Sequence, residues 1–109
     1  MRIWDIAPYR LCKDHLLGEH RELHAIWSIL TRNKNGYSKH PETLRWKGKL
    51  HSLYLRHDSL VHEMEKRGYK HHTPLEVSLA IGSKKQDKFV NSINDQIANL
   101  RKKGCKCKV

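Results

Sequence analysis

Residues 11–30, LCKDHLLGEHRELHAIWSIL, carry the clearest structural pattern in the chain. Their apolar positions recur at intervals of three and four residues, which predicts one buried face of an α-helix. We expect this helix to begin at about Tyr9 or Leu11 and to end at Leu30, with Pro8 in its approach or first turn. The apolar face consists of Cys12, Leu16, Leu23, Ile26, Trp27 and Leu30.

A second helix is predicted from near Pro41 to Arg67, with a possible bend at Gly48. Gly68 directly after two basic residues is typical of a helix end. The apolar positions expected to be buried on this helix are Leu50, Leu53, Tyr54, Val61 and Met64.

A third helix is predicted to open at Ser83, because Gln86 follows three residues later at the spacing of a capping box, and to close at Gly104. Its expected apolar face is Phe89, Val90, Ile93, Ile97 and Leu100. The stretch 74–81, PLEVSLAI, is compatible with an apolar connector, a strand-like segment or a helical turn.

These patterns predict an all-α fold. We expect residues 1–109 to form a compact single domain of three main helices, with an N-terminal segment packed near the first helix. Residues 101–109 are basic and are predicted to form a flexible tail.

The charge of the chain points to its partners. Twenty-two Lys and Arg against eleven Asp and Glu give a net charge of +11, which favours polyanions, nucleic acid before a membrane surface. The plainer alternative is that the charge only maintains solubility. The sequence shows neither a signal peptide nor a membrane span, and three cysteines make no disulfide framework, so we expect a cytoplasmic monomer.

Three ionisable residues share one side of the first helix. His15, Glu19 and Glu22 are spaced i, i+4 and i+7, and the small residues Gly18 and Ala25 flank Glu22. This spacing predicts a carboxylate beside a shallow groove. The alternative is structural: Glu22 pairs with a nearby arginine, and the small residues serve only to pack another helix.

The metal-ligand types in the sequence do not predict a metal site. His20 and His24 are four residues apart, but no further ligands accompany them. The pair Cys105 and Cys107 is too short a constellation for structural zinc, and we expect it in a solvated chain end. Neither a metal nor a small-molecule cofactor is therefore predicted.

The stretch HLLGEHREL at residues 15–23 resembles the signature H-L-x-x-E-x-R-E-L of the phage-type pyrimidine-dimer DNA glycosylases with abasic-site lyase activity. Weaker similarity lies in Lys66–Tyr69 and in the pattern P-x-E-x-S-x-A-I at residues 74–81. The resemblance extends from Met1 to about Ile93.

The resemblance implies an all-α enzyme whose N-terminal α-amine attacks the sugar carbon bearing the base and forms an imine with the DNA. The amine here is that of Met1, which we expect to be retained because Arg2 is too large for methionine removal. Glu22 matches the glutamate that stabilises the imine and assists β-elimination. The implied substrate is double-stranded DNA carrying a pyrimidine dimer, another damaged base or an abasic site.

The resemblance also implies residues that bind phosphate. Arg2, His15 and Arg21 are the best candidates, and Arg10 and His24 are further ones. The sequence departs from the family in two places: Ala25 replaces an arginine, and the tail lacks the aromatic residues linked to dimer recognition. The alternative function is a non-catalytic, basic helical DNA-binding protein that has kept the scaffold.

Overall fold

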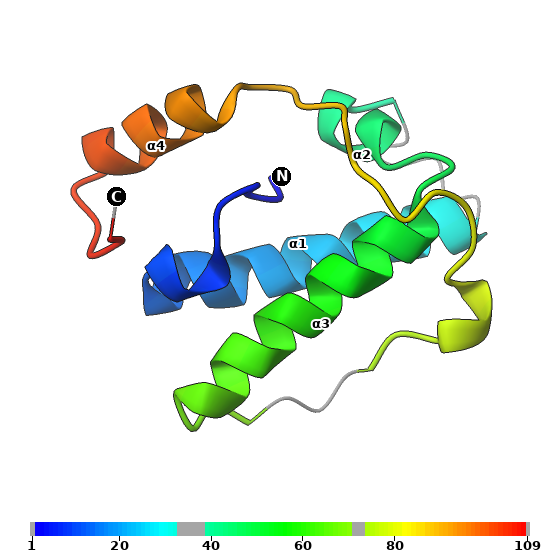
Figure 1. The fold of residues 1–109 in the computed structure, drawn as a ribbon, viewed down its shortest axis with the longest axis horizontal. Helices are drawn as coiled ribbons and strands as arrows, with labels where there is room; N and C mark the ends of the chain where they lie inside the picture. The colour runs from blue at the N-terminus through cyan, green and yellow to red at the C-terminus, as the bar shows by residue number, and fades with distance from the viewer. Residues whose placement is uncertain (1, 33–38, 71–73, 109) are drawn as a thin grey trace.

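The computed structural model describes residues 2–32, 39–70 and 74–108. Two long helices, α1 (Lys13–Arg32) and α3 (Leu50–Lys66), pack against each other, and α4 (Ile93–Lys102) lies on the other side of the N-terminal segment (Figure 1). The shorter elements are α2 (Pro41–Arg45) and the 3-10 turns η1 (Pro8–Arg10) and η2 (Val77–Leu79). The described residues form no β-strand, only an isolated antiparallel bridge between Lys49 and Gly82. The predicted all-α fold is therefore confirmed.

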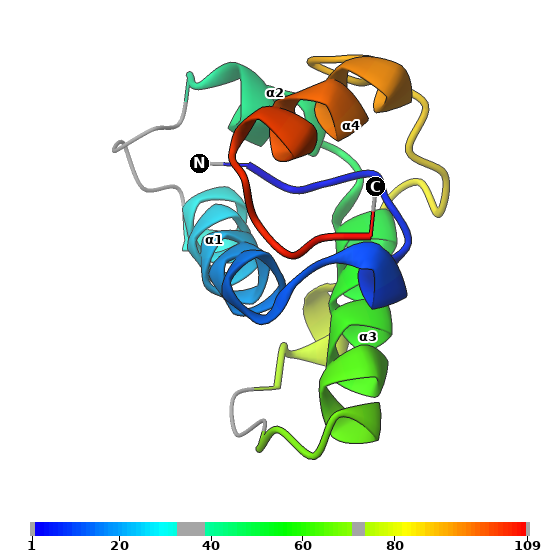
Figure 2. The ribbon, with the colours of Figure 1, turned by 90° about the vertical axis from the view of Figure 1, so that its left-hand side faces the viewer.

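The core lies between α1, α3 and the N-terminal segment. Figure 2 shows this segment and the C-terminal tail running between α4 and the two long helices. The segment contributes Ile3, Trp4 and Ile6, all nearly fully buried, which confirms that it packs near the first helix. The helices contribute fully buried side chains that form the centre of the core, namely Leu16, Leu23, Ile26, Leu53, Leu60 and Leu100.

The first two helices differ from their predicted bounds. The first starts at Lys13, because Pro8–Arg10 forms a separate 3-10 turn and Leu11 is extended. The second is two helices, with the break at Gly48, whose φ of 76° a helix cannot contain. The backbone at Gly82 lies directly against the backbone at Gly48, so a Cβ atom on Gly82 would collide with the Gly48 carbonyl.

The predicted start of the third helix is wrong. Helix α4 begins after Ser92, whose hydroxyl accepts the Asp95 N–H at 3.1 Å. This start is nine residues later than that of a helix opening after Ser83. Gln86, the partner expected in the capping box, instead donates from its side-chain amide to the Arg45 carbonyl at 2.9 Å. Gln86 is thus engaged in a tertiary contact, and residues 83–92 form no helix.

The buried face predicted for this helix is also only partly right. Phe89 and Val90 precede α4 and are each 46% exposed, and Ile93 in its first turn is 44% exposed. Ile97 packs against the core, and Leu100 is fully buried. The ambiguous stretch 74–81 contains only the short turn η2.

The C-terminal tail has a position that the sequence did not predict. The Lys108 N–H donates to the Arg10 carbonyl at 2.7 Å, and Cys105 and Cys107 pack half-buried against the core. The described part of the tail therefore returns to the beginning of α1. Its flexibility stays a prediction. None of the described helices is long and apolar enough to cross a membrane.

Candidate functional site

Three consecutive backbone N–H groups at the beginning of the chain donate hydrogen bonds to side chains of three different helices. The backbone N–H groups of Ile3, Trp4 and Asp5 donate in turn to Glu42 of α2 at 3.1 Å, Glu19 of α1 at 3.1 Å and Gln96 of α4 at 2.8 Å. All three acceptors are at most 3% exposed. An extended segment with no neighbouring strand thus has its donors satisfied by buried side chains, which fixes its path past α1.

Glu19 carries a buried charge that is matched by Arg56 of α3. The Arg56 guanidinium donates to both carboxylate oxygens, from Nε at 2.7 Å and from Nη2 at 2.9 Å. Burial raises the pKa of Glu19, whereas the charge and hydrogen bonds of Arg56 and the Trp4 N–H oppose that rise. Glu19 therefore links α1, α3 and the N-terminal segment.

Arg45 makes a second buried connection to the same segment. Its guanidinium lies 2.7 Å from Glu42 and 3.1 Å from Asp5, and it donates to the Ile3 carbonyl at 2.9 Å. Sequence reasoning missed Glu42, Arg45 and Gln96, since nothing in their local spacing indicates that they meet the N-terminus.

Glu22 lies one turn beyond Glu19 on α1 and is half-buried. Within the described ranges it forms no hydrogen bond or ion pair, so the expected structural pairing with an arginine is not found there. A Cβ on Gly18 would meet no described atom outside its own helix within 4 Å, and Ala25 is exposed. The side of α1 that carries the small residues is therefore open rather than packed against another described helix.

Met1 lies outside the described residues. Arg2, the first described residue, is half-buried and places its guanidinium carbon 4.9 Å from the centre of the Trp4 ring. Both residues border a cavity of about 610 Å³. Its remaining lining residues are His40, Asn99, Lys102 and Lys103. Arg2 and Trp4 thus border a cavity to which Arg2, Lys102 and Lys103 contribute positive charge.

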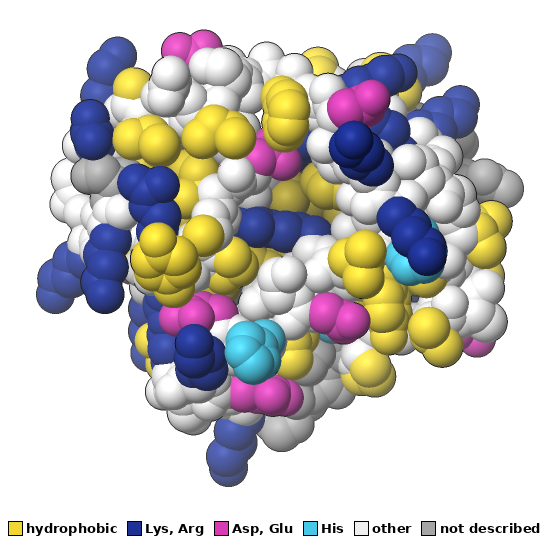
Figure 3. Space-filling view, in the orientation of Figure 1, with side chains coloured by type: hydrophobic (Ala, Val, Ile, Leu, Met, Phe, Trp, Pro, Cys, Tyr) yellow, Lys and Arg dark blue, Asp and Glu magenta, His cyan; other side chains and the backbone are white. Residues whose placement is uncertain are grey.

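Lysine and arginine residues are concentrated where α4 runs into the tail. Figure 3 shows basic side chains along the edge of the molecule formed by α4 and the tail. We call this surface the basic end, defined by the exposed residues Arg101, Lys102, Lys103, Lys106 and Lys108. The basic composition of this tail is evident from the sequence, but no local pattern indicates that the tail lies near Arg2.

The predicted phosphate-binding residues fall into two groups. Arg2 lines the cavity, Arg21 is exposed on α1 next to Glu22, and Arg10 donates from Nε to the Lys108 carbonyl at 2.9 Å. The two histidines instead face internal groups.

The Nδ1 atom of His15 lies 3.1 Å from the Cys12 sulfur and 3.3 Å from the Cys107 sulfur. The Nε2 atom of His24 lies 3.2 Å from the Nε2 atoms of both His20 and His57. Burial and the charge of Lys103 lower the pKa of His15. The charge of Asp14 raises this pKa by less, so the neutral form of His15 is favoured.

The family model for pyrimidine dimer DNA glycosylases matches residues 1–77, which include the N-terminal segment, α1, α2 and α3. No curated protein and no solved structure matches the chain. The match spans more than half of the sequence, from the first residue. The chain therefore belongs to the pyrimidine dimer DNA glycosylase family.

Proposed function

We propose that the protein is a DNA glycosylase with abasic-site lyase activity, in which the α-amine of Met1 is the nucleophile and Glu22 is the catalytic carboxylate. The observation that carries the proposal is the three-helix attachment of Ile3–Asp5. A nucleophile at a chain end needs a fixed approach to be effective, and this attachment anchors the chain four residues or fewer from the amine.

The proposed chemistry follows from an amine and a carboxylate. An α-amine has a reference pKa of about 7.7–8.0, so a useful fraction is neutral at cellular pH, and the neighbouring charge of Arg2 favours that form further. The neutral amine attacks the sugar C1′, the base departs, and the opened sugar forms an imine with the protein. Loss of a C2′ proton then expels the 3′ phosphate, and water releases the amine.

Glu22 is suited to the carboxylate role because it is half-buried and has no described ion-pair partner. An anion in such a place stabilises the iminium cation and can accept the C2′ proton. Glu19 is a poor alternative for this role, since both its oxygens already accept hydrogen bonds from Arg56. We therefore treat Glu19 as a positioning residue.

The substrate in this proposal is double-stranded DNA with a pyrimidine dimer, another damaged base or an abasic site, bound by one copy of the chain. Arg2, Arg10 and Arg21 contact phosphates, and the basic end extends the positive surface beyond them. We place His15 and His24 behind this surface, because their ring nitrogens face internal groups.

Borohydride trapping on an abasic-site duplex tests the proposal directly. The reductant converts an imine into a stable amine, so we expect a covalent protein–DNA adduct that maps to the peptide containing Met1. If the folded protein with a free N-terminus binds the duplex but is not trapped, the lyase proposal is wrong, and the protein is a non-catalytic DNA-binding member of the family.

A further inference from the structure

Three cysteines and one histidine from opposite ends of the chain meet in a single cluster. Cys12 precedes α1, His15 lies in its first turn, and Cys105 and Cys107 belong to the returning tail. Their sulfur and ring-nitrogen atoms all lie within 4.8 Å of one another. Residues as far apart in sequence as Cys12 and Cys107, 95 positions, are thus brought together by the fold.

We propose that Cys12, His15, Cys105 and Cys107 bind one Zn²⁺ ion. Zinc in structural sites takes four ligands at the corners of a tetrahedron, and Cys₃His is one of the usual sets. Bond lengths of about 2.3 Å to sulfur and about 2.0–2.1 Å to nitrogen separate neighbouring ligand atoms by roughly 3.5–3.8 Å. The described separations of His15 Nδ1 from two sulfurs, 3.1 and 3.3 Å, are close to this spacing.

The contacts around the cluster suit thiolate ligands. The Cys12 backbone N–H donates to the Cys107 sulfur at 3.1 Å, a bond that favours a negatively charged sulfur and orients it. Nδ1 of His15 faces the two sulfurs, which leaves Nε2 free to carry the ring proton of the neutral, ligating form. Each of the four residues is half-buried, as expected for a structural site near the surface.

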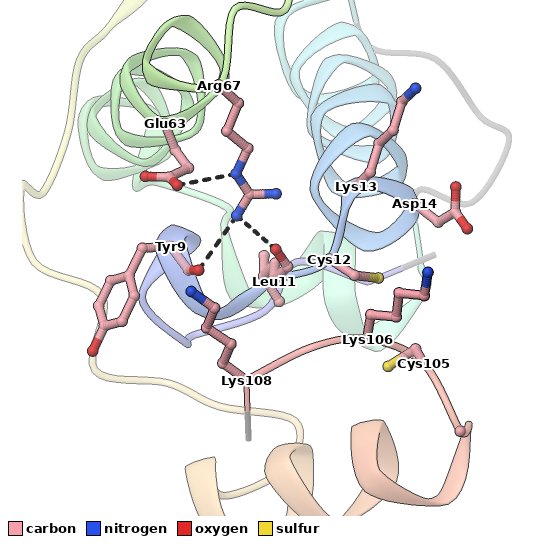
Figure 4. Close-up of a pocket in the computed structure, with 11 residues that line it drawn as sticks. Tyr9, Leu11, Cys12, Lys13, Asp14, Glu63, Arg67, Cys105, Lys106 and Lys108 are labelled. Atoms are coloured by element: carbon pink, nitrogen blue, oxygen red, sulfur yellow. Dashed lines mark hydrogen bonds and ion pairs between the residues drawn. The ribbon is translucent and has the colours of Figure 1, made fainter.

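The surrounding charge also fits. Zinc with three thiolates and a neutral imidazole carries a net charge of −1, which nearby cations stabilise. Lys13, Lys106 and Lys108 line the cavity whose wall includes Cys12 and Cys105 (Figure 4). Of the acidic residues in that wall, Glu63 pairs with Arg67 at 3.0 Å. The basic tail therefore supplies two of the four ligands, Cys105 and Cys107, together with positive charge from Lys106 and Lys108 that balances the thiolates.

A disulfide is the competing use of these cysteines. It would join two sulfurs, leave the third unpaired and give no role to His15, whose Nδ1 contacts two of the three. A zinc ion uses all four groups. The geometry therefore favours a metal over a disulfide.

The ion would attach the tail to the start of α1, beside the N-terminal segment. His15 packs edge-on against Trp4 with ring centres 5.8 Å apart, and Lys102 and Lys103 of the same returning chain line the cavity at Arg2. The family match ends at residue 77, so Cys105 and Cys107 lie outside it. The site thus fastens a segment beyond the matched region to the region that carries the proposed chemistry.

Zinc content tests the proposal without reference to catalysis. The full chain, purified under reducing conditions, is loaded with Zn²⁺, freed of excess metal and analysed for bound zinc. We expect one ion per chain, near-complete loss in Cys12→Ser and Cys107→Ser, and full retention in Lys84→Ala, which removes an exposed lysine that belongs neither to the cluster nor to the wall of its cavity. Equal zinc in Cys107→Ser and the parent would overturn the site.

Cobalt substitution supplies a readout that does not depend on whether the serine variants fold. Co²⁺ added to the reduced parent chain should give the intense thiolate-to-metal absorption and the visible bands of a tetrahedral complex, and Zn²⁺ should displace it. Absence of thiolate absorption from folded protein would overturn the proposal. A stable disulfide in place of a metal site would overturn it as well. After purification without reductant, the intact mass would then lie two hydrogens below that of the reduced chain, and adding reductant and Zn²⁺ would give no metal complex.

Discussion

The backbone N–H of Trp4 donates to the buried carboxylate of Glu19 at 3.1 Å, and that contact joins the beginning of the chain to the helix that carries Glu22. Because Arg56 holds the same carboxylate from α3, the N-terminal segment is fixed relative to both long helices. The path of residues 3–5 is thereby set by groups in the core.

The first prediction concerns Glu19→Gln. The amide still accepts from the Trp4 N–H, but it leaves the largely buried guanidinium of Arg56, 15% exposed, without its counter-charge. We expect a loss of about 2–4 kcal/mol in the free energy of unfolding, measured by urea denaturation, because an unpaired buried charge is costly. Glu65→Gln, at an exposed position of α3, is the matched control and should stay within about 0.5 kcal/mol. An equal effect of both changes would show that the Glu19 pair does not stabilise the fold.

The second prediction distinguishes the proposed catalytic role of Glu22 from the positioning role of Glu19. Glu22→Gln removes a charge that has no described partner, so we expect an unfolding free energy within about 0.5 kcal/mol of the parent and unaltered DNA affinity. Strand cleavage at an abasic site should fall about 100-fold or more, because the iminium cation loses its stabilising anion. Single-turnover cleavage rates measure this, again with Glu65→Gln as control. Cleavage at the parental rate would remove Glu22 from the mechanism.

The third prediction concerns the exposed Arg21. Arg21→Ala should weaken binding to a duplex and reduce the slope of log affinity against log salt by about 1, since one phosphate contact is lost. Fluorescence anisotropy over a salt series provides both values. Lys66→Ala, at the exposed end of α3, changes the net charge equally and should leave the slope unchanged. The same slope for Arg21→Ala and the parent would argue against a phosphate contact.

The sequence predicted the elements whose signals are local. Helix α1 has a continuous apolar stripe, and Leu16, Leu23 and Ile26 are indeed fully buried. The start of α4 was not predictable in this way, because Gln86 is held by the Arg45 carbonyl, which lies 41 positions earlier in the chain. A capping-box spacing cannot reveal such a competing contact.

The residues of the candidate site also divide into those with a local sequence signal and those that only tertiary folding brings together. Glu22 followed from the motif on α1, whereas Glu42, Arg45 and Gln96 meet the N-terminal segment only through tertiary folding. The cysteine cluster was missed for a related reason. Each half of it is too short to bind a metal by itself, and the two halves meet only because the tail returns to the beginning of α1.

The last prediction tests the crossing that separates α2 from α3. Gly82 has φ of 90°, and an added Cβ would collide with the backbone carbonyl of Gly48, which cannot move aside as a flexible side chain would. Gly68 has a similar φ of 78° but open space around it. Gly68→Ala should therefore cost only the backbone strain, about 1–2 kcal/mol, and Gly82→Ala clearly more, as measured by urea denaturation. Equal losses for the two variants would mean that the chain at Gly82 shifts without cost and that the close crossing does not define the break between the helices.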